Sequence, residues 1–277
     1  MRFTKMHGLG NNYLYINCFE EKVDDPEQLS IRLSDVHFGV GSDGIILIKP
    51  SAVADCEMDI YNADGSRAMM CGNGIRCVGK YVYERGICKK DVLKVDTQSG
   101  IKILYLNVVD GHVRSIRVDM GEPELVPSKI PVQFAGETMI DQPLEAAGET
   151  FQVTCVSMGN PHCVQFIEDT EALKIEEFGP VLEHHPIFPE RANIEFIQVQ
   201  SRNEIKMRVW ERGSNETFAC GTGACASVVA CVLNNKTDRQ VTVHLLGGDL
   251  HILWDAESNH VFMEGPAEFV FDGTVDL

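Results

Sequence analysis

The sequence lacks an apolar run that could cross a membrane, and it lacks an excess of basic residues. A membrane helix needs about 20 mostly apolar residues, and no segment approaches that length. Acidic residues exceed basic ones by 41 to 24, and the net charge of −17 disfavours binding to nucleic acid or to anionic membranes. The N-terminal residues also lack the apolar stretch of a signal peptide. These absences predict a soluble, cytoplasmic protein that acts on a small molecule.

The Cys-x-x-Cys spacing of zinc and redox sites is missing too, although the chain has ten cysteines. This number is below the density of about 8–10% seen in disulfide scaffolds, so we expect mostly reduced thiols. At about 100° per residue, neither Cys71 and Cys77 nor Cys220 and Cys225 share one helix face, and we expect no metal. Eight cysteines are interpreted as small, inert buried residues: Cys18, Cys56, Cys77, Cys88, Cys155, Cys163, Cys225 and Cys231.

A Cys-Gly-x-Gly pattern occurs twice, beginning at Cys71 and at Cys220, 149 residues apart. Several other pairs share this offset, so the chain is predicted to consist of two homologous halves. We place the N-terminal half at 1–118 plus 266–277 and the C-terminal half at 119–265, in keeping with usual domain sizes. The matching pairs are Gly10-Asn11 with Gly159-Asn160, Ile45 with Ile194, Ile48 with Ile197, Tyr61 with Trp210, Asn62 with Glu211, and Val92 with Val241.

Local patterns predict more strands than helices. Alternating apolar residues at 102–106 and 206–210 indicate strands, and 241–254 reads as a hairpin that turns at Gly247-Gly248. Helical spacing follows each cysteine motif, the first helix ending near Gly86, and Asp25-Pro26 begins another helix that runs to about Asp35. The predicted fold class is α+β, with each half a curled mixed sheet around a central helix and the active site in the cleft between the halves.

Two cysteines at helix starts suit the inversion of a carbon next to a carboxylate. The reaction needs one group to remove a proton from one face and a second group to deliver a proton to the other face. A thiol has a reference pKa of about 8.5, and a helix N-terminus lowers it further. The amides at each helix start, from Gly72 and Asn73 and from Gly221 and Thr222, can hold a carboxylate. Cys71 and Cys220 are therefore predicted to be the two bases of a racemase or epimerase that needs no cofactor.

Alternative interpretations exist for the single residues. By itself, His162 would be an ordinary structural histidine, Arg212 a solvated charge and a lone Cys-Gly-x-Gly a simple turn. The offset strengthens the case that Asn160 and Glu211 belong to the site, because the residues that it pairs with them are Asn11 and Asn62. A thiol redox or metal-binding protein and a non-catalytic amino-acid binder are the alternatives from other classes. The binder would not need a thiol at both helix starts.

Several long motifs together closely resemble the diaminopimelate epimerase family over essentially the whole chain. They are Lys5-Met6-His7-Gly8-Leu9-Gly10-Asn11, Tyr61-Asn62-Ala63-Asp64-Gly65-Ser66, Cys71-Gly72-Asn73-Gly74, Ser157-Met158-Gly159-Asn160-Pro161-His162, Pro189-Glu190-Arg191-Ala192-Asn193, Glu211-Arg212-Gly213 and Ala219-Cys220-Gly221-Thr222-Gly223-Ala224-Cys225. The resemblance implies conversion of LL-diaminopimelate to the meso form, for lysine and peptidoglycan synthesis, without pyridoxal phosphate or metal. It also implies a homodimer.

The resemblance further assigns roles to residues. It implies that Cys71 and Cys220 are the acid/base pair and that His162 and Glu211 support the thiols. The residues that it assigns to substrate binding are Asn11, Asn62, Asn160, Asn193 and Arg212, and Arg212 suits the distal carboxylate, which a guanidinium binds in bidentate fashion.

One position departs from the family pattern. Many members have a glutamine near position 44 as a binding residue, whereas this chain has Gly44. The offset pairs Gly44 with Asn193, so the position is expected to lie in the site and to contribute backbone or space. The alternative function left open is a racemase for another amino acid, such as histidine, on the same scaffold.

Overall fold

The computed structural model describes residues 1–276 and divides the chain into two compact units. Unit 1 comprises Met1–Val118 with Glu264–Leu277, and unit 2 comprises Asp119–Met263. Leu277 lies outside the described residues.

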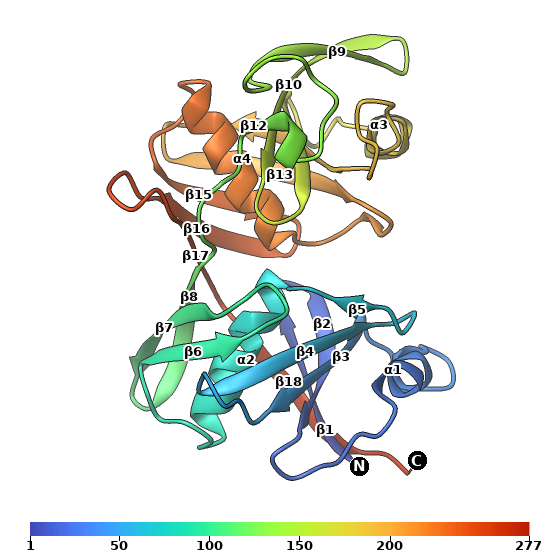
Figure 1. Cartoon of the computed structure of the whole chain (residues 1–277), viewed down its shortest axis with the longest axis vertical. Helices are drawn as coiled ribbons and strands as arrows, with labels where there is room; N and C mark the ends of the chain where they lie inside the picture. The colour runs from blue at the N-terminus through green and yellow to red at the C-terminus, as the bar shows by residue number, and fades with distance from the viewer. Residues whose placement is uncertain (277) are drawn as a thin grey trace. The chain divides into compact units, whose positions relative to one another are not determined.

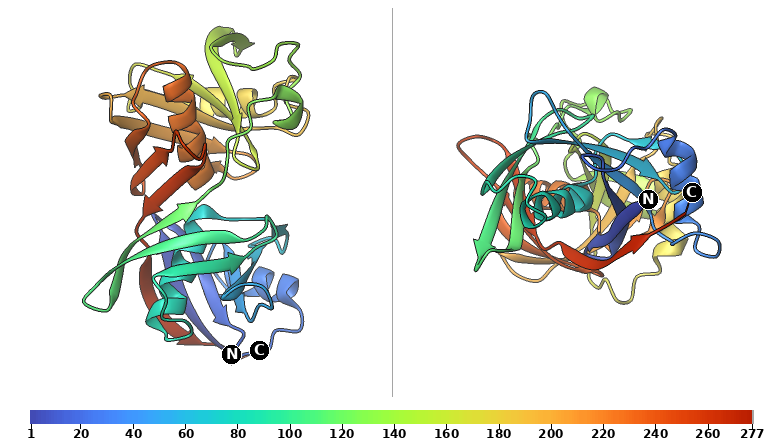
Figure 2. Two further views of the ribbon diagram at one scale, coloured as in Figure 1. Left: turned by 60° about the vertical axis from the view of Figure 1, so that its left-hand side comes forward. Right: turned by 90° about the horizontal axis from the view of Figure 1, so that it is seen from below.

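Unit 1 contains two helices, α1 (Pro26–Ser34) and α2 (Gly72–Glu84), and a strongly curved mixed sheet (Figure 1). α2 packs against β1, β2 and β7, while α1 packs against β3 and β4 on the other side of the sheet. Figure 2 (right) shows α2 nearly end-on with strands of its unit around it. The strands are β1 (Arg2–Gly8), β2 (Asn11–Asn17), β3 (Gly44–Lys49), β4 (Cys56–Asn62), β5 (Arg67–Ala68), β6 (Val92–Asp96), β7 (Lys102–Val109), β8 (His112–Asp119) and β18 (Glu268–Thr274).

Unit 2 has the same design around α4 (Gly221–Leu233), which packs against β10, β11, β12 and β16. Helix α3 (Ile175–Glu183) lies against β12 and β13, and a single 3₁₀ turn, η1, covers Pro127–Lys129. The strands are β9 (Gln142–Ala146), β10 (Glu149–Ser157), β11 (Pro161–Phe166), β12 (Asn193–Val199), β13 (Glu204–Glu211), β14 (Asn215–Glu216), β15 (Gln240–Leu245), β16 (Gly248–Trp254) and β17 (Val261–Gly265), which includes the boundary between the units.

The order of strand pairings is the same in the two units. In unit 1, β1–β2, β3–β4 and β6–β7 are antiparallel, and β2–β3 and β4–β6 are parallel. In unit 2, β10–β11, β12–β13 and β15–β16 are antiparallel, and β11–β12 and β13–β15 are parallel. Leu14 pairs with Ile45, and 149 residues later Cys163 pairs with Ile194. The strands that support the two cysteines are therefore laid out alike.

Each unit has its own apolar core. In unit 1, Leu14, Ile16 and Leu47 are buried together with Leu33 of α1. In unit 2, a second cluster gathers apolar residues from β9 to β13 and from α3. Apolar residues also alternate along strands such as β15, as expected for a sheet with one buried face.

The structure confirms the predicted α+β class and most of the predicted elements. The strands, the hairpin and both cysteine-led helices lie where their patterns indicated, and Asp25 caps α1 through its side chain. The sequence analysis did not predict α3. All ten cysteines are free thiols, but Cys18 and Cys88 are partly exposed, so the expectation of burial was wrong for these two.

Candidate active site

Cys71 occupies the N-cap position of α2. Its backbone is extended, with φ −137° and ψ 114°, and its Sγ accepts a hydrogen bond from the Gly74 amide at 3.3 Å. The same Sγ lies 3.2 Å from Asn11 Oδ1. A carbonyl oxygen only accepts, so the thiol donates to Asn11. The helix start also favours negative charge, which suits a thiol that must ionise.

The strand β2 brings Asn11 and Tyr13 to this thiol. Asn11 Nδ2 donates to Asp43 Oδ2 at 2.9 Å, and the Asn12 amide donates to the same oxygen at 2.7 Å. Burial, followed by the charges of Cys71 and Asp43, raises the pKa of Tyr13 well above its usual value, so its phenol stays neutral beside the thiol. Asp43 thus fixes the side chain that accepts the hydrogen bond from the Cys71 thiol.

Gly44 and Asn62 face each other across β3 and β4. Gly44 has φ +152°, and a Cβ there would lie 2.1 Å from the Tyr61 carbonyl oxygen and 3.0 Å from Tyr13 Cε1. This position therefore offers only backbone. Asn62 Nδ2 donates to Ser66 Oγ at 3.0 Å.

Arg76, which is fully buried, forms hydrogen bonds with the first turn of α2. Arg76 donates to the Asn73 side-chain oxygen at 3.0 Å and to the Gly72 carbonyl at 3.1 Å. It also donates to the Pro266 carbonyl at 3.1 Å. Asn73 is thus turned towards Arg76, so that its backbone amide, rather than its side-chain oxygen, suits the predicted ligand contact.

Cys220 occupies the equivalent N-cap position of α4, which begins at Gly221. It is 5% exposed, and its Sγ lies 3.6 Å from Thr222 Oγ1. Burial, together with the charge of Glu211, raises the pKa of Cys220 well above its usual value. The neutral thiol is therefore the favoured form in unit 2, and a neutral thiol is a proton donor.

Glu211, the last residue of β13, is half-buried beside Cys220. Burial raises the pKa of Glu211, although a hydrogen bond from the Thr217 hydroxyl acts in the opposite direction. The next residue, Arg212, is half-buried, and its Nη1 donates to the Glu190 carbonyl at 3.0 Å. The carboxyl of Glu211 and the guanidinium of Arg212 are thus neighbours at the end of β13.

Asn193, at the start of β12, joins two segments of unit 2. Its Oδ1 accepts from the Arg212 amide at 2.9 Å, and its Nδ2 donates to the Pro161 carbonyl at 2.9 Å. Both side-chain groups of Asn193 are therefore engaged within the protein, where they fix the backbone at Arg212.

His162 lies on β11 with no exposed surface. Its Nε2 is 3.0 Å from Asn160 Oδ1, and its Nδ1 is 2.6 Å from Glu195 Oε1. Asn160 Nδ2 in turn donates to Thr222 Oγ1 at 3.3 Å. The predicted residues His162, Asn160 and Thr222 are thus brought together with Cys220.

Four polar residues around the thiols were not predicted from the sequence: Tyr13, Asp43, Arg76 and Glu195. The offset could not identify Arg76 or Glu195, because it pairs them with Cys225 and Ile46, which are not polar residues of the same kind. Tyr13 is the exception, since the offset pairs it with His162 and could have identified it.

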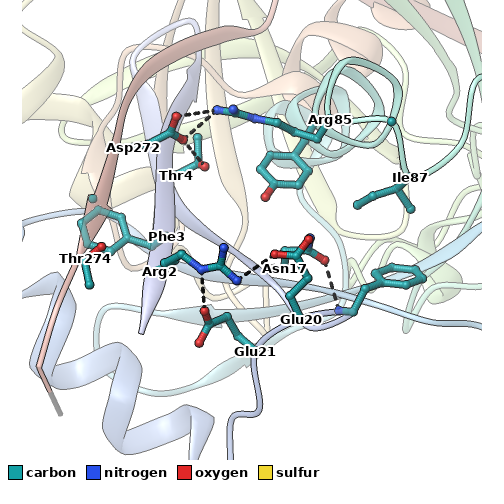
Figure 3. Close-up of a pocket in the computed structure, with 14 residues that line it drawn as sticks. Arg2, Phe3, Thr4, Asn17, Glu20, Glu21, Arg85, Ile87, Asp272 and Thr274 are labelled. Carbon is teal, nitrogen blue, oxygen red and sulfur yellow. Dashed lines mark hydrogen bonds and ion pairs between the residues drawn. The ribbon is translucent and has the colours of Figure 1, made fainter.

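A surface pocket in unit 1 contains none of these residues (Figure 3). Its charged groups bind one another: Arg85 Nη2 lies 2.7 Å from Asp272 Oδ1, and Arg2 pairs with Glu20 and Glu21. Because these charged side chains are taken up by ion pairs with one another, the pocket offers less to a charged amino acid than the surroundings of the two thiols do.

The chain is similar to known proteins over its whole length. The family model described as diaminopimelate epimerase matches residues 3–126 and 154–270. A diaminopimelate epimerase of Acetivibrio thermocellus is 56% identical over 277 residues, covering 100% of this chain and 99% of the relative. One from Methanococcus maripaludis strain C5 is 49% identical over 277 residues and covers 100% of both chains.

Solved structures share the fold at low identity. A probable proline racemase from Agrobacterium radiobacter aligns with a TM-score of 0.74 at 13% identity, covering 100% of this chain and 93% of that one. A phenazine biosynthesis protein of the PhzF family from Bacillus anthracis aligns with a TM-score of 0.72 at 16% identity, covering 100% and 99%. No helix in residues 1–276 is long and apolar enough to cross a membrane.

Proposed function

Because the chain belongs to the diaminopimelate epimerase family, we propose that it interconverts LL-diaminopimelate and meso-diaminopimelate, in the supply of lysine and peptidoglycan precursors. The observation that carries this proposal is the pair of thiols, each at the start of a buried helix in one of two similarly built units. The full-length match at 56% identity supports the substrate, rather than histidine or another amino acid.

We propose a two-base mechanism for this reaction. One thiolate takes the α-proton, so that the C–H bond breaks, an S–H bond forms and the electron pair stays on carbon. The other thiol then gives its proton to the opposite face and becomes a thiolate. The raised pKa of Cys220 favours its neutral thiol, which donates its proton when the Cys71 thiolate is the base. After one turnover the two roles are reversed.

The remaining residues divide between binding and support of the thiols. The amides of Gly72, Asn73, Gly221 and Thr222 hold the reacting carboxylate, and Arg212 holds the distal one. His162 and Glu211 support Cys220. The other proposed binding residues are Asn11, Gly44 through its backbone, Asn62, Asn160, Asn193 and Glu211, which also supports the thiol.

We further propose that the enzyme is a cytoplasmic homodimer and that units 1 and 2 are the two homologous halves. The support is the likeness to the family and the recurrence of the strand pairings. The mass of the purified chain in solution, measured by light scattering, tests the homodimer.

Isotope exchange tests the function directly. With LL-diaminopimelate in deuterated water, we expect deuterium at the α-carbon, and we expect Cys71→Ala and Cys220→Ala each to abolish turnover. Exchange into another amino acid but not into diaminopimelate would overturn the substrate. Full turnover by either alanine variant would overturn the two-base mechanism.

A further inference from the structure

A continuous chain of polar contacts leads from a buried carboxyl to the Cys220 thiol. It runs from Glu195 Oε1 to His162 Nδ1 at 2.6 Å, and from His162 Nε2 to Asn160 Oδ1 at 3.0 Å. It continues from Asn160 Nδ2 to Thr222 Oγ1 at 3.3 Å, and from Thr222 Oγ1 to Cys220 Sγ at 3.6 Å. All five residues belong to unit 2, and Glu195 is the one without an assigned role.

The partners fix the direction of this chain. The amide oxygen of Asn160 only accepts, so His162 Nε2 carries a hydrogen and donates it. Asn160 Nδ2 only donates, so Thr222 accepts there and its own hydrogen is left for the Cys220 sulfur. Each link thus points towards the thiol, which is the arrangement that stabilises a thiolate.

The 2.6 Å contact between Glu195 and His162 must also hold one proton, since both groups are fully buried. Either a protonated carboxyl donates to Nδ1, or an imidazolium donates to a carboxylate. The pair has no net charge in both arrangements. By itself the carboxylate of Glu195 raises the pKa of Cys220, and the proton shared with His162 offsets that charge.

The buried position of Glu195 is unfavourable for one of its carboxyl oxygens. Its Oε2 is buried and has no hydrogen-bond partner, and a polar atom in that state is unfavourable. A Cβ on Gly223 would lie 2.7 Å from Glu195 Oε1, so the glycine in the first turn of α4 admits the carboxyl. At the equivalent place in unit 1 the offset gives Ile46, which is buried and apolar. Strand packing alone does not require a carboxyl here.

We propose that Glu195 is a positioning residue for Cys220: it orients His162, and through Asn160 and Thr222 it directs a hydrogen bond onto the sulfur. This role rests on the proposed function of Cys220 as one of the two bases. It explains why a glutamate is buried behind one of the thiols and an isoleucine stands at the matching place behind the other.

The test compares Glu195→Gln with Glu195→Ile. Glutamine can donate an N–H to His162 Nδ1 and so keeps the series of polar contacts. Isoleucine is the residue found at the equivalent position 46 of unit 1, and it removes the contact with His162. We expect kcat of the isoleucine variant to fall by about 10- to 100-fold, the usual effect of losing a group that orients a histidine. We expect kcat of the glutamine variant to stay within about threefold of the parent, with a smaller change in KM than in kcat for both.

A second readout follows the thiol itself, in a Cys71→Ser background that does not depend on turnover. The rate of Cys220 alkylation by iodoacetamide is measured against pH by peptide mass spectrometry. We expect its midpoint to move to higher pH in the isoleucine variant and to stay unchanged in the glutamine variant. The titratable groups near Cys220 are His162 from β11, Glu195 from β12 and Glu211 from β13, and Cys163 of β11 is a further one near Glu195.

Gln165→Leu is the matched control, because Gln165 is a buried polar residue of the same sheet whose side chain makes no hydrogen bond. It should leave both readouts unchanged. Near-parental kcat for Glu195→Ile would overturn the proposal, as would a glutamine variant as impaired as the isoleucine one, or an unchanged alkylation profile. Turnover by Cys220→Ala would overturn the proposed function, while the alkylation midpoint would still report on the chain.

Discussion

At the scale of single residues, Gly44 has a backbone conformation that other residues adopt only with strain. Its φ of +152° and the 2.1 Å approach of a Cβ to the Tyr61 carbonyl oxygen leave no room for a side chain. We expect Gly44→Ala to lower the free energy of unfolding by more than about 3 kcal/mol, because backbone strain of about 1–3 kcal/mol adds to a backbone clash. Urea unfolding measures this change.

Gly86 provides the control for the strain alone. Its φ is +77°, and a Cβ there would meet nothing within 4 Å. Gly86→Ala should therefore cost only about 1–2 kcal/mol, which is the strain without the clash. Equal losses in the two variants would show that β3 moves to accommodate the new methyl group.

The two thiols and most of their neighbours could be predicted from the sequence, because both halves repeat a motif at one offset. Glu195 could not, since a single acidic residue in the strand Asn193–Val199 looks like an ordinary outward-facing position. The inward contact of Asn73 with Arg76 could not be predicted either. Both depend on tertiary contacts that local patterns do not encode.

At the scale of elements, Arg76 joins the first turn of α2 to the segment before β18. It donates hydrogen bonds to Gly72, Asn73 and Pro266. We expect Arg76→Met to lower the free energy of unfolding by about 3 kcal/mol or more, because each buried acceptor that loses its partner costs about 1–3 kcal/mol. Arg114→Met, at an exposed position of β8, should change it by less than about 0.5 kcal/mol. A similar melting temperature for both variants would contradict this prediction.

The cysteine-led helices were predictable because glycine-rich starts and apolar spacing mark them. Helix α3 has apolar spacing at Ile175, Phe178 and Leu182, but it has no glycine-rich start. Its N-cap, Lys174, makes no side-chain cap bond, and Pro180 lies inside the helix. Gly179 is explained by packing, since a Cβ there would lie 2.6 Å from the Trp210 ring. The helix α3 therefore depends on its contacts with β12 and β13.

At the scale of the whole molecule, two separate cores predict unfolding that departs from a single two-state transition. Both tryptophans, Trp210 and Trp254, belong to unit 2. Tryptophan fluorescence therefore reports on unit 2, while far-ultraviolet circular dichroism reports on both units. A probe-dependent midpoint would reveal the two transitions.

Asp59 of unit 1 allows the separate unfolding of the two units to be tested, because its ion pairs with Arg67 and Lys49 lie within unit 1. Burial raises the pKa of Asp59, but hydrogen bonds from Arg67 and Lys49 outweigh burial and hold the pKa below 3.8. A lowered pKa stabilises the fold above the unfolded value, and this stability is lost as pH falls through the folded value. We expect Asp59→Asn to cost about 2 kcal/mol at pH 7, in line with hydrogen bonds to charged groups, and progressively less below pH of about 4.

The loss should be confined to the unit that contains Asp59. In urea at pH 7, the part of the circular dichroism transition that does not coincide with the fluorescence change should move to lower urea in Asp59→Asn, while the fluorescence midpoint stays in place. Arg202→Gln is the reciprocal control, because its pair with Asp238 lies on the exposed surface of unit 2 and contributes less than about 1 kcal/mol. If Asp59→Asn shifts both signals equally, the two cores unfold together, and the similar halves share one cooperative transition.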